Sequence, residues 1–324
     1  MLRFSRRAIC AALALGACTA GFGQVTYPDK PIRLVVPYPP GGFTDILGRM
    51  LATQLQTRLG QNVIVDNKGG GGSTIGTSMV ARAPADGYTL LLVAVDLAIN
   101  ESLMSSRLSY DARKDFSPVI RAAWSPMVLV TNPSVPAKNV AEFLALAKAR
   151  PGKINFASGG VGTGAHLALE LFKTRAGVDV IHVPYKGNGP ATSDLLGGQV
   201  SAMFLQYAVA KPFILSGKLH MLATPSGKRS QAIPDVPTIA ESGLPGFDVE
   251  PWFGIVAPAG TPATVIGRLN AEITKIMQQS DVKEMLASVG ATPSVSTPQE
   301  FAKFIDSEVT RWGEVVKASG AKAD

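Results

Sequence analysis

The stretch Ile32-Arg33-Leu34-Val35-Val36-Pro37-Tyr38-Pro39-Pro40-Gly41-Gly42-Phe43-Thr44-Asp45 decides the fold of this 324-residue chain. Its first five residues predict a buried strand, and residues 46–59 repeat apolar side chains at helical spacing. Glycine lets the backbone turn its N–H groups toward a ligand, and the first turn of a helix offers unpaired donors and a partial positive charge. The stretch therefore predicts a strand, a turn and a helix that together can hold an anion.

Two further glycine turns follow the same pattern. One is Asn67-Lys68-Gly69-Gly70-Gly71-Gly72-Ser73-Thr74, and the other is Ala157-Ser158-Gly159-Gly160-Val161-Gly162-Thr163-Gly164. Each follows a short apolar run and precedes a predicted helix. Several such turns that face one cleft make a carboxylate or phosphate site without a cationic side chain. In a chain with few catalytic residue types, this pattern points to capture of an anion.

Strand and helix patterns alternate in two sets, which predicts an α/β fold with mostly parallel sheets flanked by helices. The second set starts after Phe116, and the apolar run 252–256 is expected to return to the first sheet. Two crossings make a hinged pair of lobes, 24–124 with 250–324 and 125–249. Ligands in open α/β sheets bind beyond the carboxyl ends of the strands, where all three glycine turns are placed.

The end of the chain is expected to be helical. Thr261-Pro262 predicts an N-cap with proline at the first helical position, and Thr297-Pro298-Gln299-Glu300 predicts a capping box. After the capping box, Phe301, Phe304, Ile305 and Trp312 recur at helical spacing, which favours a core-facing helix.

Residues 1–23 predict a signal peptide and therefore export. Arg3, Arg6 and Arg7 precede an apolar stretch, 8–17, that is too short to span a bilayer. Small residues before Gln24 favour ordinary cleavage there. The alternative is the lipobox-like Leu15-Gly16-Ala17-Cys18, which would leave Cys18 acylated.

Composition excludes several function classes. Both cysteines, Cys10 and Cys18, lie in the predicted signal, so we expect no disulfide, thiolate metal site or cysteine nucleophile. Removing the signal lowers the net charge from +7 to +4, because it holds three arginines and no other charged residue. The remaining charge is dispersed and argues against nucleic acid binding. The three histidines show no metal-ligand spacing, so no metal is expected.

Two enzymatic alternatives arise from single motifs. Residues 160–165 fit the dinucleotide pattern G-x-G-x-x-A, but Asp179 begins its predicted strand instead of ending it, and we expect no cofactor. Ser158 or Ser193 with His166 suggests an exported hydrolase, although the chain has no G-x-S-x-G elbow. We expect no enzymatic activity.

Many motifs in one order carry a family resemblance. They include Tyr27-Pro28-Asp29-Lys30-Pro31-Ile32, Val65-Asp66-Asn67-Lys68, Ala85-Asp86-Gly87-Tyr88-Thr89-Leu90, Val183-Pro184-Tyr185-Lys186-Gly187 and Asp194-Leu195-Leu196-Gly197-Gly198-Gln199-Val200. With these motifs the chain resembles the Bordetella-uptake-gene-type periplasmic solute-binding proteins of tripartite tricarboxylate transporters.

The resemblance implies a two-lobed, Venus-flytrap binding protein in the periplasm. It implies a monomer that holds a small carboxylate and delivers it to integral membrane transporter subunits. A ligand-sensing receptor of a signalling system is the alternative. The first-lobe contacts implied are Gly41, Gly42, Phe43, Thr44, Asp45 and Asn67. The second-lobe contacts implied are Ser158, Gly159, Gly162, Thr163, His166, Tyr185, Lys186 and Gly187.

Asp96 departs from the family pattern. The family usually has small or hydroxyl-bearing residues after the third strand, where this chain has Val93-Ala94-Val95-Asp96-Leu97. Asp96 is either a cap bonded to nearby backbone or a ligand contact. As a contact, its carboxylate would favour an amino acid, a hydroxy acid or a nitrogen-heterocyclic acid over a plain dicarboxylate, because like charges repel.

Overall fold

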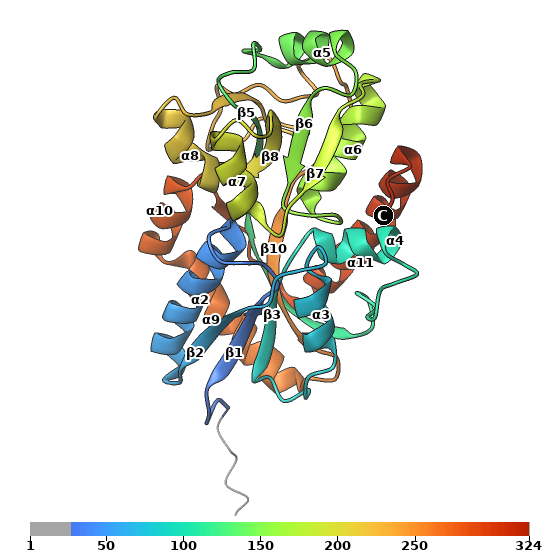
Figure 1. Cartoon of the computed structure of the whole chain (residues 1–324). Helices are drawn as coiled ribbons and strands as arrows, with labels where there is room; N and C mark the ends of the chain where they lie inside the picture. The colour runs from blue at the N-terminus through green and yellow to red at the C-terminus, as the bar shows by residue number, and fades with distance from the viewer. Residues whose placement is uncertain (1–26, 324) are drawn as a thin grey trace, which may run out of the picture.

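The computed structural model describes residues 27–323 as two lobes, each built on one β-sheet with helices packed against it (Figure 1). The predicted signal peptide and the lipobox cysteine lie outside the described residues. Within residues 27–323, no helix combines the length and apolar composition needed to cross a bilayer.

Lobe 1 carries a six-stranded sheet in the order β11-β4-β10-β3-β1-β2. Its strands are β1 (Ile32–Val36), β2 (Val63–Asn67), β3 (Thr89–Ala94), β4 (Phe116–Trp124), β10 (Trp252–Pro258) and β11 (Thr292–Pro293). Its helices are α2 (Phe43–Leu59), α3 (Thr74–Ala81), α4 (Asp96–Leu103), α9 (Ala263–Gln278), α10 (Ser280–Ser288) and α11 (Pro298–Ser319).

Lobe 2 carries a five-stranded sheet in the order β7-β6-β8-β5-β9. Its strands are β5 (Met127–Thr131), β6 (Asn155–Ser158), β7 (Ile181–Pro184), β8 (Ala202–Gln206) and β9 (His220–Ala223). Its helices are α5 (Val140–Ala149), α6 (Gly164–Ala176), α7 (Asn188–Leu196) and α8 (Tyr207–Leu215).

The two-lobed α/β architecture expected from the sequence is confirmed, but both sheets are mixed where mostly parallel sheets were expected. Strand β1 runs parallel to β2 and β3, whereas β10 runs antiparallel to β3 and β4. In lobe 2, β6 is parallel to β7 and β8, and β5 is antiparallel to β8 and β9. The antiparallel pairs in lobe 1 follow from connectivity, because the chain leaves this lobe through β4 and returns through β10.

The two crossings between the lobes lie side by side. Residues 125–126 link β4 to β5, and the segment before Trp252 links lobe 2 back to β10. The backbone N–H of Ser125 donates to the carbonyl oxygen of Pro251 over 3.4 Å, which joins the two crossings.

Helix ends match the sequence only in part. The capping box is confirmed, since Thr297 and Glu300 exchange side-chain to backbone hydrogen bonds at the start of α11. The predicted N-cap at Thr261 is wrong, because its hydroxyl donates to the carbonyl of Pro258 and α9 begins at Ala263.

Helix α4 was not predicted. Its residues 96–100 are all buried, so no amphipathic period marks it.

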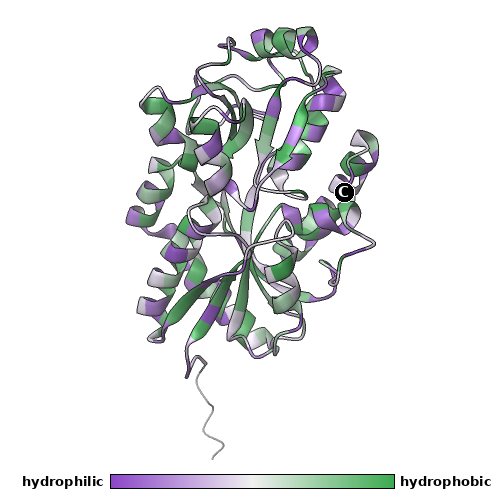
Figure 2. Ribbon diagram, viewed as in Figure 1, coloured by the Kyte–Doolittle hydropathy of each residue, from purple (hydrophilic) through white to green (hydrophobic). Residues whose placement is uncertain are grey.

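The apolar core is continuous across the lobes. One cluster lies between the lobe 1 sheet and helices α2 and α9. A second cluster starts on the opposite face of that sheet, includes Trp252 and Trp312, and extends through the interior of lobe 2. Figure 2 shows hydrophobic residues concentrated on the strands and on the helix faces turned toward them. As expected, Phe301, Ile305 and Trp312 of α11 face this core.

A buried carboxylate anchors α11 to the sheet. Glu308 accepts hydrogen bonds from the indole N–H groups of Trp252 at 2.9 Å and Trp312 at 3.0 Å. Arg311 donates to its other oxygen at 3.1 Å. The side chains of Glu308, Trp252 and Trp312 are all buried. Water cannot reach their polar atoms, so these hydrogen bonds satisfy groups that would otherwise have no partner.

We expect Glu308→Leu to lower the free energy of unfolding by roughly 2–5 kcal/mol, because it leaves two buried indole donors without an acceptor. Glu308→Gln keeps an acceptor oxygen and should lose less. Denaturant unfolding of the three proteins checks the order. Equal stability of Glu308→Leu and the wild type would show that this anchor contributes nothing.

Candidate functional site

A cavity lies between the lobes, beyond the carboxyl ends of β1, β3, β6 and β8. Its empty space, including the part open to solvent, is about 580 Å³. Its lining residues are Tyr38, Pro39, Gly42, Thr44, Ala94, Val95, Asp96, Met127, Gly159, Thr163, Gly164, Ala165, Asn188, Gln206, Pro251 and Phe253. Both lobes and one crossing therefore contribute to it.

Five helices begin at this cavity. The lining includes Thr44 of α2, Asp96 of α4, Gly164 of α6 and Asn188 of α7, together with Gln206, the N-cap of α8. The first N–H groups of a helix have no partner within it, and the helix dipole places partial positive charge there. No lysine, arginine or histidine is among the described lining residues. These lining residues therefore offer an anion backbone N–H groups and no cationic side chain.

In lobe 1, the start of α2 is fixed from two sides. Gly42 is the N-cap and makes no side-chain cap bond, so the N–H groups of Phe43 and Thr44 stay available. The Phe43 ring packs edge-to-face on Phe253, with centroids 4.7 Å apart. Asp45 accepts from the Gly41 N–H at 3.1 Å and from the Asn67 amide at 3.0 Å.

Asp45 supports the turn and does not line the cavity. Burial acts to raise the pKa of its carboxyl, but hydrogen bonds from Arg49, Asn67 and the Gly41 N–H outweigh burial and hold the pKa below its usual value. Asp45 is therefore ionised at neutral pH. Asn67 also donates to the carbonyl of Tyr38 at 3.0 Å, which joins the ends of β1 and β2.

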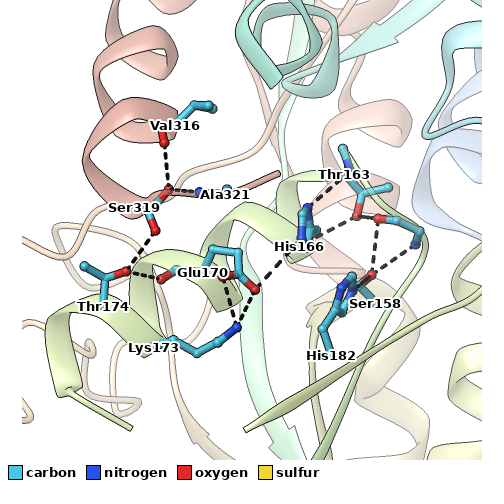
Figure 3. Close-up of polar contacts among 12 residues, drawn as sticks. Ser158, Thr163, His166, Glu170, Lys173, Thr174, His182, Val316, Ser319 and Ala321 are labelled. Atoms are coloured by element: carbon cyan, nitrogen blue, oxygen red, sulfur yellow. Dashed lines mark hydrogen bonds and ion pairs between the residues drawn. The ribbon is translucent and has the colours of Figure 1, made fainter. Parts of the chain in front are cut away.

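In lobe 2, a buried polar cluster supports the start of α6 (Figure 3). The Gly162 N–H donates to Nδ1 of His166 at 3.3 Å, and the Thr163 hydroxyl donates to the Gly160 carbonyl at 2.7 Å. Ser158 Oγ lies 2.7 Å from Nε2 of His182 and accepts from the Gly160 N–H at 3.1 Å. The turn is thus bonded from behind, and the first two residues of α6, Gly164 and Ala165, line the cavity.

The two histidines of this cluster stack on each other. Their ring centroids are 4.4 Å apart, with 21° between the planes. Burial lowers the pKa of His166 to about 4, with a smaller contribution from Lys173. Burial lowers the pKa of His182 to about 4 as well, assisted by His166. Both rings are neutral at neutral pH, and Nδ1 of His166 acts as an acceptor.

A second, outer hollow of about 1040 Å³ adjoins the cavity and shares Tyr38, Pro39 and Gly159 with it. Its other lining residues are Gly70, Gly71, Gly72, Ser73, Thr74, Met104, Arg107, Gly160, Val161, Pro184, Tyr185, Lys186, Gly187 and Ala323. Unlike the inner cavity, it carries two cations, Arg107 and Lys186. The Tyr185 hydroxyl donates to Asp194 at 2.6 Å.

The structure divides the residues proposed from the sequence into three groups. Those lining the inner cavity are Gly42, Thr44, Asp96, Gly159 and Thr163. Those lining the outer hollow are Gly159, Tyr185, Lys186 and Gly187. Those behind the lining are Gly41, Phe43, Asp45, Asn67, Ser158, Gly162 and His166. The site residues proposed from the sequence did not include Tyr38 and Gln206, although each stands at or just beyond the carboxyl end of a strand.

The lobes touch across the cleft at glycine residues. A Cβ atom built on Gly72 of lobe 1 would overlap the carbonyl oxygen of Val161 in lobe 2. A Cβ on Gly187 of lobe 2 would lie 2.8 Å from Cγ of Pro39 in lobe 1. These contacts define a closed arrangement of the lobes. Among the described residues, no cluster of three or more His, Cys, Asp or Glu side chains is placed to hold a metal ion.

Comparison with known proteins places this geometry in a family. The model of the tripartite tricarboxylate transporter family receptor matches residues 47–321. Protein BugT of Bordetella pertussis is 44% identical over 312 residues, which are 96% of this chain and 95% of that protein. The chain therefore belongs to this family of solute-binding receptors, and the resemblance seen in the sequence is confirmed.

Solved structures agree with this assignment. The structure of R. palustris Rpa4515 with adipate is 35% identical, has a TM-score of 0.88 and aligns over 91% of this chain and 98% of its own. MatC from Rhodopseudomonas palustris with bound malate is 33% identical, has a TM-score of 0.85 and aligns over 90% of this chain and 100% of its own. The periplasmic binding protein fold is thus shared.

The histidine pair predicts a pH dependence of stability. Both rings have a pKa near 4 in the folded protein, against an ordinary value of 6.5. Between these values the unfolded chain binds roughly two more protons than the folded one. This stabilisation is fully present above about pH 6.5 and is lost as the pH falls toward about 4.

The unfolding temperature should therefore fall between about pH 7.5 and about pH 5, and the fall should be larger for the wild type than for the double variant His166→Asn and His182→Gln. Each replacement keeps an amide oxygen near the nitrogen that makes the hydrogen bond but cannot titrate. A parallel fall in both proteins would mean that the histidines are not responsible.

Proposed function

We propose that this protein is a periplasmic receptor that captures a small organic carboxylate between its lobes for a tripartite tricarboxylate-type transporter. The observation that carries the proposal is the convergence of five helix N-termini on a cavity with no lysine, arginine or histidine among its described lining residues. Unpaired first-turn N–H groups bind an oxyanion through charge-assisted hydrogen bonds, each worth roughly 1.5–3 kcal/mol.

The relatives support a carboxylate as the ligand. Two structures that share the fold and a third or more of the sequence were solved with adipate and with malate. Both ligands are small carboxylic acids. Support for export comes from the predicted signal peptide, and we propose cleavage before Gln24 with acylation of Cys18 as the alternative.

We further propose that the lobes are residues 24–124 with 250–324 and residues 125–249, and that the protein acts as a monomer. Strand membership in the two sheets supports these boundaries. A ligand that contacts both lobes stabilises the closed arrangement by its differential affinity for it. The closed form would then be presented to membrane transporter subunits. A sensor in place of a transporter is the alternative partner.

A hydrolytic function is less well supported. Ser158 pairs with His182 and not with His166, and its hydroxyl is completely buried behind the turn. Nδ1 of His166 already accepts a hydrogen bond from the Gly162 N–H. A nucleophile must reach its substrate, and neither Ser158 nor His166 lines the cavity. We therefore propose binding without catalysis. Turnover of an ester panel would contradict this.

A thermal-shift screen against mono-, di- and tricarboxylates and aromatic acids tests the proposed function. We expect at least one acid to raise the unfolding temperature, because a ligand that binds only the folded state stabilises it. Isothermal titration then gives the affinity. If no acid in the screen stabilises the protein, the proposal fails.

Closure can be tested at Gly72. Gly72→Ala places a methyl group against the Val161 carbonyl of the other lobe, and the φ of +60° adds strain. Gly71→Ala is the matched control, because its φ is +59° and its Cβ would meet only Thr74 and Ile75, both of its own lobe. We expect similar losses of stability, on the order of 1 kcal/mol from backbone strain.

Only Gly72→Ala should prevent the decrease in radius of gyration that small-angle scattering detects when the best acid of the screen is added. The same variant should also bind that acid roughly tenfold or more weakly, since a loss of about 1.4 kcal/mol of binding free energy is a factor of ten in Kd. Normal compaction of Gly72→Ala would contradict ligand-driven closure at this contact.

A further inference from the structure

Asp96 is the one carboxylate among the described residues that line the inner cavity. It is the first residue of α4 and only 2% exposed. The Tyr38 hydroxyl donates to one carboxylate oxygen, and the Ser73 hydroxyl donates to the other. Both donors belong to lobe 1 loops, so the carboxylate is held in a fixed position at the wall of the cavity.

No protein cation accompanies this carboxylate. The ion pairs formed within residues 27–323 do not include Asp96, and its side-chain partners are neutral hydroxyls. Burial raises the pKa of Asp96, while the hydrogen bonds from Ser73 and Tyr38 act in the opposite direction. An ionised carboxylate accepts up to about four hydrogen bonds, so two hydroxyls and the backbone N–H of Asp96 itself leave room for one further donor.

The carboxylate lies close to the predicted anion site. Val95, the neighbour of Asp96, contacts the start of α6, because a Cβ on Gly164 would lie 2.8 Å from Cγ1 of Val95. Asp96 and the first-turn N–H groups of α6 therefore border the same small space. A ligand carboxylate bound to those N–H groups would bring the atoms next to it toward Asp96.

We propose that Asp96 determines specificity by accepting a hydrogen bond from an ammonium or hydroxyl group that the ligand carries next to its bound carboxylate. This inference rests on the proposed function, binding of a carboxylate in the inner cavity. A ligand without such a donor would place negative charge near the Asp96 carboxylate with nothing between them, which is unfavourable where water is excluded. The ligand class is therefore 2-amino or 2-hydroxy acids.

Isothermal titration with matched acids tests the inference. One series is succinate, malate and aspartate, and the other is glutarate, 2-hydroxyglutarate and glutamate. Within each series the chain length is constant and only the substituent at carbon 2 changes. We expect the wild type to bind at least one aminated or hydroxylated acid roughly 10- to 100-fold more tightly than the unsubstituted acid, as for a charge-assisted hydrogen bond.

Asp96→Asn should remove this preference selectively. The amide is nearly the same size but carries no charge, so affinity for the substituted acids should fall roughly 10- to 100-fold while that for succinate or glutarate is unchanged or improved. Asp66→Asn is the matched control. It removes the same charge from the same lobe at a residue that pairs with Arg33 and Lys68 and lines neither hollow.

The outcomes separate the two proposals. If succinate or glutarate binds as well as or better than every substituted acid in the wild type, the inference is wrong and the proposed function stands. Equal losses for substituted and unsubstituted acids in Asp96→Asn also overturn it, because Asp96 would then be structural. If none of the six acids binds, and the wider acid screen is negative too, both proposals fail. The wild-type comparison does not depend on the variant folding.

Discussion

The unpaired N–H groups at the starts of helices are the feature on which this structure depends. Helices α2 and α4 of lobe 1, and α6, α7 and α8 of lobe 2, each begin within a few residues of the strand before them. Because the carboxyl ends of these strands point toward the opposite lobe, their helix N-termini meet at one cavity. The same connectivity that builds the two sheets thus concentrates partial positive charge between the lobes without any cationic side chain.

The rest of each lobe holds these helix starts in place. In lobe 1 the Asp45 carboxylate and the Phe43 ring fix the first turn of α2. In lobe 2 the stacked His166 and His182 rings and Ser158 fix the turn before α6. The lobes also share a core through Trp252 and α11, whose last residues lie beside α6 (Figure 1). Opening must leave that core intact, so we expect motion to be confined to the cleft side, about the paired crossings.

The sequence was sufficient to predict the two lobes and the glycine turns at strand ends, because short apolar runs and glycine-rich turns are local signals. It was not sufficient for the mixed sheets, since antiparallel pairing of β10 with β3 and β4 depends on the path of the whole chain. Helix α4 escaped prediction because it is buried on all sides at its start. Its Asp96 was identified as a departure from the family, but its hydroxyl partners come from two distant loops.

The roles of Ser158 and His166 show the same limit. Residue type and proximity in sequence suggested a hydrolytic pair, whereas strand pairing in the fold brings His182 of β7 to Ser158 of β6 instead. Conversely, Gln206 and Tyr38 reach the cavity only because of where their strands end. Sequence therefore locates the turns that form the site, and tertiary structure decides which of their side chains face the ligand.

A crystal structure of the protein with a carboxylic acid that binds it tests the central claim most directly. We expect the ligand carboxylate to lie in the inner cavity, within roughly 3 Å of first-turn N–H groups of α2 and α6 or joined to them through one water. A carboxylate bound instead by Lys186 or Arg107 in the outer hollow would contradict the claim that backbone N–H groups at helix starts hold the anion.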